Sequence, residues 1–481
     1  MGMMRRRSFK TAILSGLIAV VTLLMPANLY ASDLSGNNEK ILSDVVAISG
    51  GERAVYAIKK DGTVWAWGGF RDSGLLGNGY TVPSTSPVQM KIDNAKDIAS
   101  GSRHTLILKK DGTVWATGSN EDGQLGIGMT SYDKALEPVQ IKELVNVKAI
   151  AAENNQSLAL LEDGTVWQWG KTDRVNPPSN KPVKVEGLFS GLDISAGNGS
   201  AIMLDDRGKV HVWGTRLFDT NPDKLRNPTE ISGTKEYTAI ATSRQRGAAI
   251  QTDGTVWTWN NSKQFPTPGE LLIPVKVQRT ENARQIVGGS SSSFISIIKK
   301  DGTVWTWDNY WDKSSYKALQ VKGISDAVDL ASSQFSGHYA LLKNGTVMKW
   351  TMELGEPSEP KPVNAPIKVV MKGETLSLVI PPIIINNVSY VPLRGVFEPL
   401  GATIEWNQGN FKGVVKKDDI TIEINTSSEG MELNGKTLTG ELKPISVNYV
   451  TMVPLRFLSE TLGAEVKWQS DKNTIYINLP K

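Results

Sequence analysis

The chain has 481 residues, of which 40% are hydrophobic and 21% are charged, an ordinary balance for a globular protein long enough to bury a large core. It contains no cysteine, which excludes disulfides, thiolate nucleophiles and zinc sites built on cysteine. The formal net charge is +4, and residues 1–31 carry four basic and no acidic side chains, so the remainder is close to neutral. A neutral chain has no overall attraction to nucleic acid or anionic lipid, and we expect no nucleic-acid partner.

Residues 1–31 are typical of a secretory signal peptide. Basic side chains occupy the segment Arg5–Lys10, an apolar run of about 15 residues covers Thr11–Met25, and Ala31 offers a small residue for cleavage. A spanning helix needs about 20 apolar residues, so the short run favours a cleaved signal, with an uncleaved anchor as the alternative. The pair Arg6-Arg7 leaves both general secretion and twin-arginine export open. No later stretch is long and apolar enough to span a bilayer, and we expect a secreted or cell-envelope protein.

The next part of the chain, residues 41–355, contains an internal repeat. The segment Asp61–Gly68 recurs at intervals of 43–52 residues, which gives seven copies that each contain a turn glycine. Each copy couples an Asp-Gly pair, which suits a tight hairpin turn, to a Thr-Val-Trp run that is typical of a strand. The seven glycines are Gly62, Gly112, Gly164, Gly208, Gly254, Gly302 and Gly345.

Both faces of these predicted strands are apolar. Val64 and Ala66 point to one side of the strand, and Trp65 and Trp67 point to the other. Small sheets stacked face to face around an axis bury both faces and leave only short edges. The repeat therefore predicts a mainly β fold, a seven-bladed β-propeller over residues 41–355. A linear solenoid is the alternative, but it would need polar capping repeats at its ends.

The second repeat shows a family resemblance. Three segments resemble the regulator of chromosome condensation (RCC1) repeat: Ala99–Leu108 (ASGSRHTLIL), Asp111–Trp115 (DGTVW) and Gly118–Gly126 (GSNEDGQLG). The resemblance implies a seven-bladed RCC1-like β-propeller. The eukaryotic founder of that family exchanges nucleotide on a small GTPase, but a shared fold does not transfer that activity.

Residues 356–366 are rich in proline and suggest an extended linker. Residues 367–481 then hold a second duplication, in which Val391–Ala402 matches Val453–Ala464 at an offset of 62, with the halves dividing near residue 428. Each half is expected to form strands around one short helix. The pair resembles the copper amine oxidase N-terminal-like domain, a module of exported proteins from Gram-positive bacteria that does not carry the oxidase site. We therefore expect a small duplicated α+β domain.

Candidates for chemistry are few, and we expect no catalytic residue, cofactor or metal. Eleven of the fourteen tryptophans occupy repeated strand positions, which indicates packing between blades. Trp311 lies outside the repeat and forms, with Tyr310 and Tyr316, an aromatic loop that is a candidate binding surface for protein or sugar; simple loop packing is the alternative. Structural roles are favoured for the three histidines, because they lie in different repeats: His104, His211 and His338.

These features favour a monomeric binding or scaffolding protein that is not an enzyme. Its propeller loops would recognise a protein or a cell-envelope polysaccharide, with the C-terminal domain as a spacer or envelope-associated module. Three alternatives remain: a secreted inhibitor of a hydrolase, a polysaccharide-active enzyme in the propeller, and guanine-nucleotide exchange as in the propeller family. An enzyme would require paired acids or an Arg/His/Tyr cluster on one face. The linear sequence shows none, although blades bring distant residues together.

Overall fold

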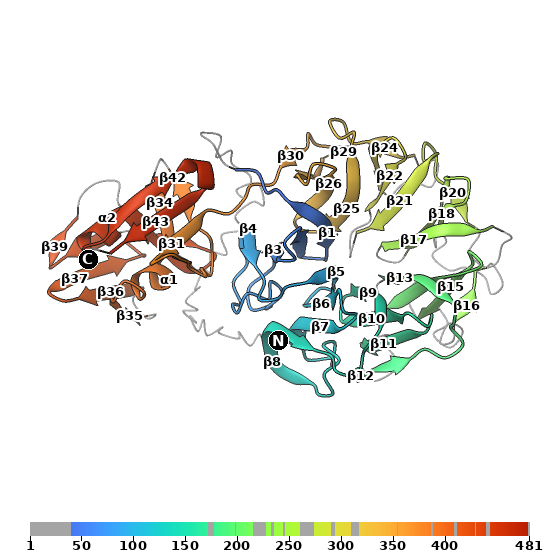
Figure 1. The fold of residues 1–481 in the computed structure, drawn as a ribbon, viewed down its shortest axis with the longest axis horizontal. Coiled ribbons are helices and arrows are strands. Elements are labelled where there is room, and N and C mark those ends of the chain that lie inside the picture. The colour runs from blue at the N-terminus through green and yellow to red at the C-terminus, as the bar shows by residue number, and fades with distance from the viewer. Residues whose placement is uncertain are drawn as a thin grey trace, which may run out of the picture. The chain divides into compact units, whose positions relative to one another are not determined.

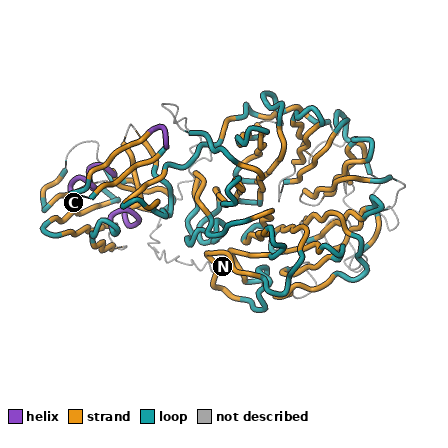
Figure 2. The backbone as a smooth tube through the Cα atoms, viewed as in Figure 1, coloured by secondary structure: helices purple, strands orange, loops and turns teal. Residues whose placement is uncertain are grey.

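The described part of the chain is almost entirely β-structure. A computed structural model describes residues 40–479, with gaps at 172–177, 198, 215–227, 232–234, 244–245, 260–273, 290–293, 309–316, 354, 386–387, 408–410, 429 and 439–442. Within these residues, helices occur only near the C-terminal end of the chain (Figure 2). No helix of the described residues has the length and apolar composition that crossing a bilayer requires.

Seven four-stranded sheets form the blades of the predicted propeller (Figure 1). Within a blade, successive strands are hydrogen-bonded neighbours and run antiparallel, as hairpin turns require. Blades 1 and 2 contain β1 (Val45–Gly50), β2 (Ala54–Lys59), β3 (Val64–Gly68), β4 (Ser84–Gln89), β5 (Ala95–Ser100), β6 (His104–Lys109), β7 (Val114–Asn120) and β8 (Ser131–Gln140). Blades 3 and 4 contain β9 (Val147–Glu153), β10 (Gln156–Leu161), β11 (Val166–Gly170), β12 (Ser179–Lys184), β13 (Gly191–Gly197), β14 (Ser200–Asp205), β15 (Val210–Gly214) and β16 (Thr229–Glu230).

The remaining blades repeat this order. Blades 5 and 6 contain β17 (Tyr237–Ser243), β18 (Arg246–Gln251), β19 (Val256–Trp259), β20 (Val275–Lys276), β21 (Ala283–Gly288), β22 (Phe294–Lys299), β23 (Val304–Asp308) and β24 (Leu319–Gln320). Blade 7 contains β25 (Ala327–Ser333), β26 (Gly337–Leu342), β27 (Val347–Trp350) and β30 (Lys361–Pro362).

The first strand of every blade lies innermost, and these strands form a closed ring. Figure 1 shows β1, β5, β9, β13, β17, β21 and β25 around a common centre. Each contacts the inner strand of the next blade, and β25 contacts β1, so the last blade meets the first. The tryptophan at the end of each Val-Trp-x-Trp run packs in a hydrophobic cluster shared by two blades; Trp307 and Trp169 are 1% and 0% exposed. The closed ring of seven blades confirms the predicted fold and excludes the linear solenoid.

The proline-rich segment 356–366 contributes to blade 7. Within this segment, β30 pairs with β27 and so forms the fourth strand of blade 7. The short hairpin of β28 (Met352–Glu353) and β29 (Glu356–Pro357) lies between these two strands in sequence. Beyond β30, the amide of Leu42 donates to the Val363 carbonyl (2.8 Å), which ties the start of the described chain to the end of the ring.

The C-terminal domain contains three sheets and the two helices. One sheet has the order β32-β31-β43-β42, a second β33-β34-β41-β40, and a third runs from β35 to β39. The first half contains β31 (Lys368–Met371), β32 (Glu374–Thr375), β33 (Ile383–Ile385), β34 (Val388–Pro392), α1 (Leu393–Phe397), β35 (Thr403–Asn407), β36 (Lys412–Lys417) and β37 (Ile420–Asn425). The second half contains β38 (Gly430–Leu433), β39 (Lys436–Thr437), β40 (Ile445–Val447), β41 (Val450–Pro454), α2 (Leu455–Thr461), β42 (Glu465–Gln469), a 3₁₀ turn (Ser470–Lys472) and β43 (Thr474–Asn478).

The duplication in this domain is a structural symmetry. Val391 of β34 pairs directly with Val453 of β41, its equivalent in the other half, and the two strands are antiparallel. The helix that follows each strand is short and buries its apolar face in one shared core, which includes Phe397 and Leu458. The two halves therefore pack about a local twofold axis, as the repeated sequence implies.

The C-terminal domain contacts blade 1, and both belong to the unit Glu39–Lys481. The Asn448 amide donates to the Pro83 carbonyl at 3.1 Å. The Arg71 guanidinium lies 4.5 Å from the centroid of the Tyr449 ring. Asn448 and Tyr449 both have positive φ angles, 48° and 66°, so the turn between β40 and β41 presents these two side chains in an uncommon conformation.

Candidate functional site

The two ends of the propeller are built from different connections. At the hairpin end, the turns between second and third strands lie beside the residues that precede the first strands; the Lys60 amide donates to the Asp44 carbonyl (2.8 Å). At the loop end, the turns between first and second strands meet the loops between third and fourth strands; the Gly69 amide donates to the Arg53 carbonyl (2.7 Å). The two ends therefore present different kinds of surface to a partner.

The hairpin end is held by a repeated hydrogen-bonded clamp. In blade 1, the Asp61 carboxylate accepts bonds from the Thr63 amide (2.9 Å) and hydroxyl (2.6 Å), and the Thr63 hydroxyl accepts one from the Trp65 indole (3.1 Å). The hydroxyl bond, with a smaller contribution from the amide, lowers the pKa of Asp61. These carboxylates stabilise turns, and the Asp-Thr pair recurs at Asp111, Asp163, Asp253 and Asp301.

The loop end carries an arginine between two aromatic rings, where blades 7 and 1 meet. We call this group the Arg53 patch (Arg53, Phe70 and Phe335). The Arg53 guanidinium carbon lies 4.6 Å from the centroid of the Phe70 ring and 4.6 Å from that of the Phe335 ring. Phe335 is 62% exposed, which is unusual for a large apolar side chain. Arginine and aromatic residues are enriched in protein interfaces and dominate their binding energy.

Hydrogen bonds across the blade boundary fix the backbone of the Arg53 patch. The Phe335 amide (3.3 Å) and the Ser333 hydroxyl (3.1 Å) both donate to the Glu52 carbonyl. The Ser336 hydroxyl donates to the Arg53 carbonyl at 3.4 Å. A partner that binds this surface would therefore meet side chains that are already ordered, which lowers the entropic cost of association.

Three carboxyl groups lie on inner strands of the ring, and we call them the channel acids. Asp97, Asp193 and Asp329 each occupy the third position of an inner strand. Burial raises the pKa of Asp97 to about 6, repulsion by the other two carboxylates adds to this shift, and burial raises the pKa of Asp193 to about 6 as well. Asp329 accepts bonds from the Ile48 amide (3.0 Å) and the Gln285 side chain (2.7 Å). Among the described residues, no three acids or histidines lie close enough to hold a metal ion.

Each histidine has a hydrogen-bond or packing partner within the propeller. His104 bonds to the Ser157 hydroxyl (2.8 Å), and burial lowers its pKa to about 3. His338 stacks on Trp350 with ring centroids 5.6 Å apart, and burial lowers its pKa to about 4. The third histidine, His211, lies 3.0 Å from Asp205. His104 and His338 are neutral at physiological pH, and the three are not brought together.

The predicted aromatic loop with Tyr310, Trp311 and Tyr316 lies outside the described residues, and its role stays a prediction. The Arg53 patch has no distinct signal in the sequence, because Arg53 occupies the same Gly-x-Arg turn as Arg103 and looks like a repeat consensus position. The channel acids can be recognised in the sequence. In three of the seven repeats, an aspartate followed by Ile or Leu interrupts an inner strand that is otherwise mostly apolar or small.

The architecture defines a class, the RCC1-type β-propeller joined to a small duplicated domain. Comparison with protein families supports both parts. The regulator of chromosome condensation (RCC1) repeat matches residues 61–108 and 111–160, and a second description of that repeat matches 95–124. The copper amine oxidase N-terminal domain matches residues 370–477. The chain thus carries RCC1 repeats followed by a copper amine oxidase N-terminal domain, which confirms both resemblances.

Relatives with known names share the propeller. Human E3 ubiquitin-protein ligase HERC2 is 28% identical over 239 residues, which cover 46% of this chain and 5% of that protein. The Ultraviolet-B receptor UVR8 of Arabidopsis thaliana is 23% identical over 246 residues, covering 46% of this chain and 54% of the receptor. The regulator of chromosome condensation of Xenopus laevis is 24% identical over 261 residues, covering 47% and 62%. The chain therefore spans less than two thirds of the length of each of these relatives.

Solved structures show the same fold. Human WBSCR16 aligns with a TM-score of 0.51 and 19% identity, over 65% of this chain and 94% of that one. Prp20p from Saccharomyces cerevisiae aligns with a TM-score of 0.50 and 18% identity, over 68% and 88%. At this identity the likeness concerns the fold alone.

The residues of the C-terminal domain do not fit the copper that its family name implies. Protein copper sites use imidazole, thiolate or thioether ligands. All three histidines of the chain lie before residue 340, and the chain has no cysteine, so residues 370–477 offer neither imidazole nor thiolate. The three methionines of this segment, Met371, Met431 and Met452, are buried in its hydrophobic clusters. A copper site built on imidazole or thiolate therefore cannot form within this domain.

Proposed function

We propose that this chain is an exported binding protein whose propeller recognises a protein ligand through its loop end. The Arg53 patch is the observation that carries the proposal. It combines an exposed aromatic ring, a stacked guanidinium and a backbone fixed by hydrogen bonds, which are the features of an interface hot spot. RCC1-like propellers are typically binding or exchange factors, and in one solved structure of this fold yeast RCC1 (Prp20) is bound to Kap60.

The non-enzymatic part of the proposal rests on how the titratable groups are used. The repeated aspartates hold turns, and the histidines have packing or hydrogen-bond partners. The channel acids accept bonds from the backbone amides that follow them, at 2.8–2.9 Å. His104 and His338 each bond to a serine hydroxyl, Ser157 at 2.8 Å and Ser332 at 3.0 Å. Both imidazoles and both hydroxyls are buried, so neither pair is presented to a substrate.

The export part of the proposal rests on residues 1–31 and on the near-neutral remainder of the chain. Expression of the full chain with an epitope tag in its own host, followed by fractionation, tests it. We expect the tag in the medium or the cell envelope, on a protein shortened by about 31 residues. Recovery of full-length protein from the cytosol alone would contradict export.

Two matched substitutions test the role of the loop end. Phe335→Ser removes the exposed ring of the Arg53 patch, and Phe189→Ser removes a comparably exposed phenylalanine (68% against 62%) at the hairpin end. A ligand is first isolated on the wild-type protein from an envelope extract of the host, and its affinity for all three proteins is then measured by surface plasmon resonance.

We expect Phe335→Ser to weaken that affinity by about 30-fold, corresponding to a hot-spot loss of roughly 2 kcal/mol. Phe189→Ser should change it less than about twofold. Equal affinity of all three proteins would reject the loop end, and a larger effect of Phe189→Ser would move the interface to the hairpin end.

A further inference from the structure

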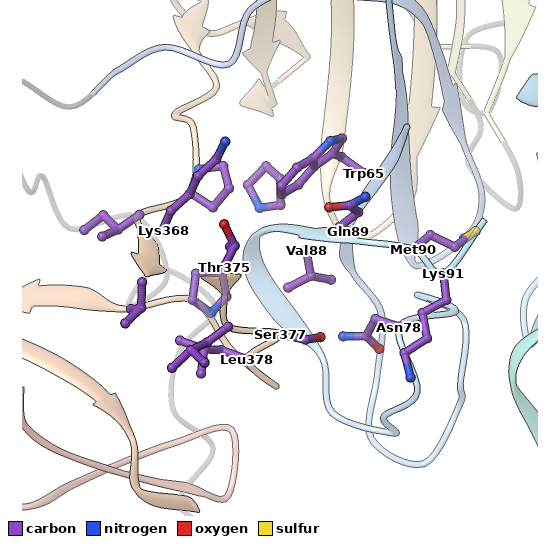
Figure 3. A pocket seen from close by; sticks show the side chains of 16 residues that line it. Trp65, Asn78, Val88, Gln89, Met90, Lys91, Lys368, Thr375, Ser377 and Leu378 are labelled. Carbon is purple, nitrogen blue, oxygen red and sulfur yellow. The ribbon is translucent and has the colours of Figure 1, made fainter. Parts of the chain in front are cut away.

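A cavity of about 250 Å³ lies between blade 1 and the C-terminal domain (Figure 3). One wall is formed by Pro87–Gln89 of β4 and by Met90 and Lys91, which follow that strand. The other wall is formed by residues 366–369 and 375–378 of the C-terminal domain. Pro381 of the C-terminal domain and Trp65 and Asn78 of blade 1 complete the lining.

Asn78 places an unpaired hydrogen-bond donor in this cavity. Its side chain is buried, with 3% exposed, and its Nδ2 atom has no hydrogen-bond partner. Its Oδ1 atom accepts a bond from the Tyr80 amide (3.3 Å), which fixes which end of the amide faces the loop and which faces the cavity. Figure 3 shows the amide directed across the cavity toward the side of Ser377. A buried donor without an acceptor costs about 1–3 kcal/mol, so a ligand with an acceptor atom here gains affinity.

The charge of the cavity favours an anion. Of the sixteen described residues that line it, two are lysines, Lys91 and Lys368, and none is aspartate or glutamate. Lys91 already forms an ion pair with Glu137, at 2.5 Å, and Lys368 supplies positive charge from the opposite wall. The hydroxyl groups of Thr375 and Ser377 add donors and acceptors at the exposed rim.

Apart from Gln89, the remaining lining is apolar, and the volume limits the size of the ligand. Trp65 lines one side, and Val88 and Met90 line another. Pockets for drug-sized ligands measure roughly 300–1,000 Å³, so about 250 Å³ suits a ligand of about one ring. An indole surface beside hydroxyl, amide and ammonium groups matches a sugar ring, whose C–H face is apolar and whose edge is polar.

We propose that this cavity binds a hexuronic acid unit, either free or within an acidic polysaccharide. The carboxylate of the sugar pairs with Lys368, a ring or hydroxyl oxygen accepts the hydrogen bond from Asn78, and the apolar face of the ring lies against Trp65. This site is separate from the Arg53 patch, so it does not rest on the proposed protein-binding function. Because the two walls come from blade 1 and from the C-terminal domain, the fusion of the two domains creates the site.

Isothermal titration of the full chain with glucuronate and with glucose tests the proposal. We expect glucuronate to bind at least about tenfold more tightly than glucose, because glucose lacks the carboxylate. Asn78→Asp keeps the size of the side chain but replaces the donor with a negative charge, and should weaken glucuronate binding by at least about tenfold. Lys368→Ala should weaken it by about three- to tenfold and leave the weak binding of glucose unchanged.

Lys343→Ala, an exposed lysine of blade 7, is the matched control and should bind glucuronate like the wild type. Lys368 is exposed, so its variant stays informative even if Asn78→Asp fails to fold. Titrations with galacturonate and with oligogalacturonate, which contain the same sugar, separate a free sugar acid from a polymer-bound unit. Absence of glucuronate binding to the wild type, or equal binding to the wild type and Lys368→Ala, would overturn the proposal.

Discussion

The hairpin end and the loop end of the propeller arise from the same seven repeats but carry different information. At the hairpin end, an Asp-Thr pair with the same geometry recurs in five blades, with hydroxyl-to-carboxylate distances of 2.6–2.7 Å. At the loop end, the connections between third and fourth strands that the structure describes differ from one another. In blade 1 it supplies Phe70 to the Arg53 patch, and in blade 7 it contains the hairpin of β28 and β29. The repeated end specifies the scaffold, and the varied end provides the surface on which recognition can evolve.

The largest effect is expected where a repeated residue lies between blades. Trp307→Ala removes a side chain that is 1% exposed and packed against residues of blades 5 and 6, and should destabilise the chain by about 3–5 kcal/mol. Trp305, two residues earlier on the same strand, is only half-buried beneath Lys299, whose Nζ lies 4.1 Å from its ring centroid. Trp305→Ala should therefore cost about 1 kcal/mol. Urea unfolding followed by circular dichroism compares the two variants. Equal losses in the free energy of unfolding would contradict the conclusion that Trp307 packs between blades whereas Trp305 is only half-buried.

A smaller effect is expected for a polar contact between two blades. The Tyr56 hydroxyl, in blade 1, bonds to the Thr105 hydroxyl of blade 2 at 2.7 Å and to the Leu75 carbonyl at 3.2 Å. Because the group is fully buried, its pKa is raised to about 12, and its removal leaves buried partners with fewer bonds. Tyr56→Phe should cost about 1.5 kcal/mol, whereas Tyr132→Phe, at a tyrosine that is 88% exposed, should cost nothing measurable in the same unfolding experiment.

The blades could be predicted from the sequence because each repeat encodes its own local structure. Asp61-Gly62 sets a turn, Val64–Trp67 sets a strand with two apolar faces, and both signals act over a few residues. The last strand, β30, escaped prediction because Lys361 and Pro362 have no apolar alternation. They form a strand because the edge of β27 offers unpaired backbone groups.

The candidate sites depend on contacts between residues far apart in sequence. Phe335 belongs to blade 7 and Arg53 to blade 1, and only closure of the ring brings their side chains together. Asn78 and Lys368 line one cavity only because the C-terminal domain contacts blade 1. No local sequence pattern indicates that the residues of either site lie together. The fold could therefore be predicted from the sequence, and these two sites could not.

Substitution of a channel acid should change the free energy of unfolding by about 1 kcal/mol, and the change should depend on pH. The folded state holds the proton of Asp97 up to a pKa of about 6, whereas the unfolded chain loses it near the ordinary value of 3.8. Folding stability from this group is therefore lost as the pH rises from about 4 to 6. A pKa difference of this size corresponds to about 3 kcal/mol for a fully buried group, but Asp97 is only half-buried, so solvent screening reduces the effect. Asp97→Asn should therefore stabilise the chain by about 1 kcal/mol at pH 7.5 and leave it unchanged at pH 3.5, measured by urea unfolding at both values.

Asp301 provides the control for this prediction, because its carboxylate should affect folding stability in the opposite direction. Hydrogen bonds from Thr303 lower the pKa of Asp301, so its contribution is present at neutral pH and is lost in acid. Asp301→Asn should therefore destabilise the chain at pH 7.5 and have less effect at pH 3.5. A stability of Asp97→Asn that equals the wild type at both pH values would mean that solvent in the channel screens the carboxylate.

The smallest effects test whether the hairpin clamps act independently. Asp61→Ala removes two acceptor contacts from Thr63, at 2.9 and 2.6 Å, and Asp301→Ala removes the same two from Thr303, at 2.9 and 2.7 Å. Because these turns are exposed, each loss should be about 0.5 kcal/mol. Blades 1 and 6 are not neighbours in the ring, so the double variant should lose the sum of the two within about 0.3 kcal/mol. A double loss well above the sum, seen in the same urea titrations, would mean that the closed ring couples distant blades, and the repeated end would then be a cooperative element and not a set of independent clamps.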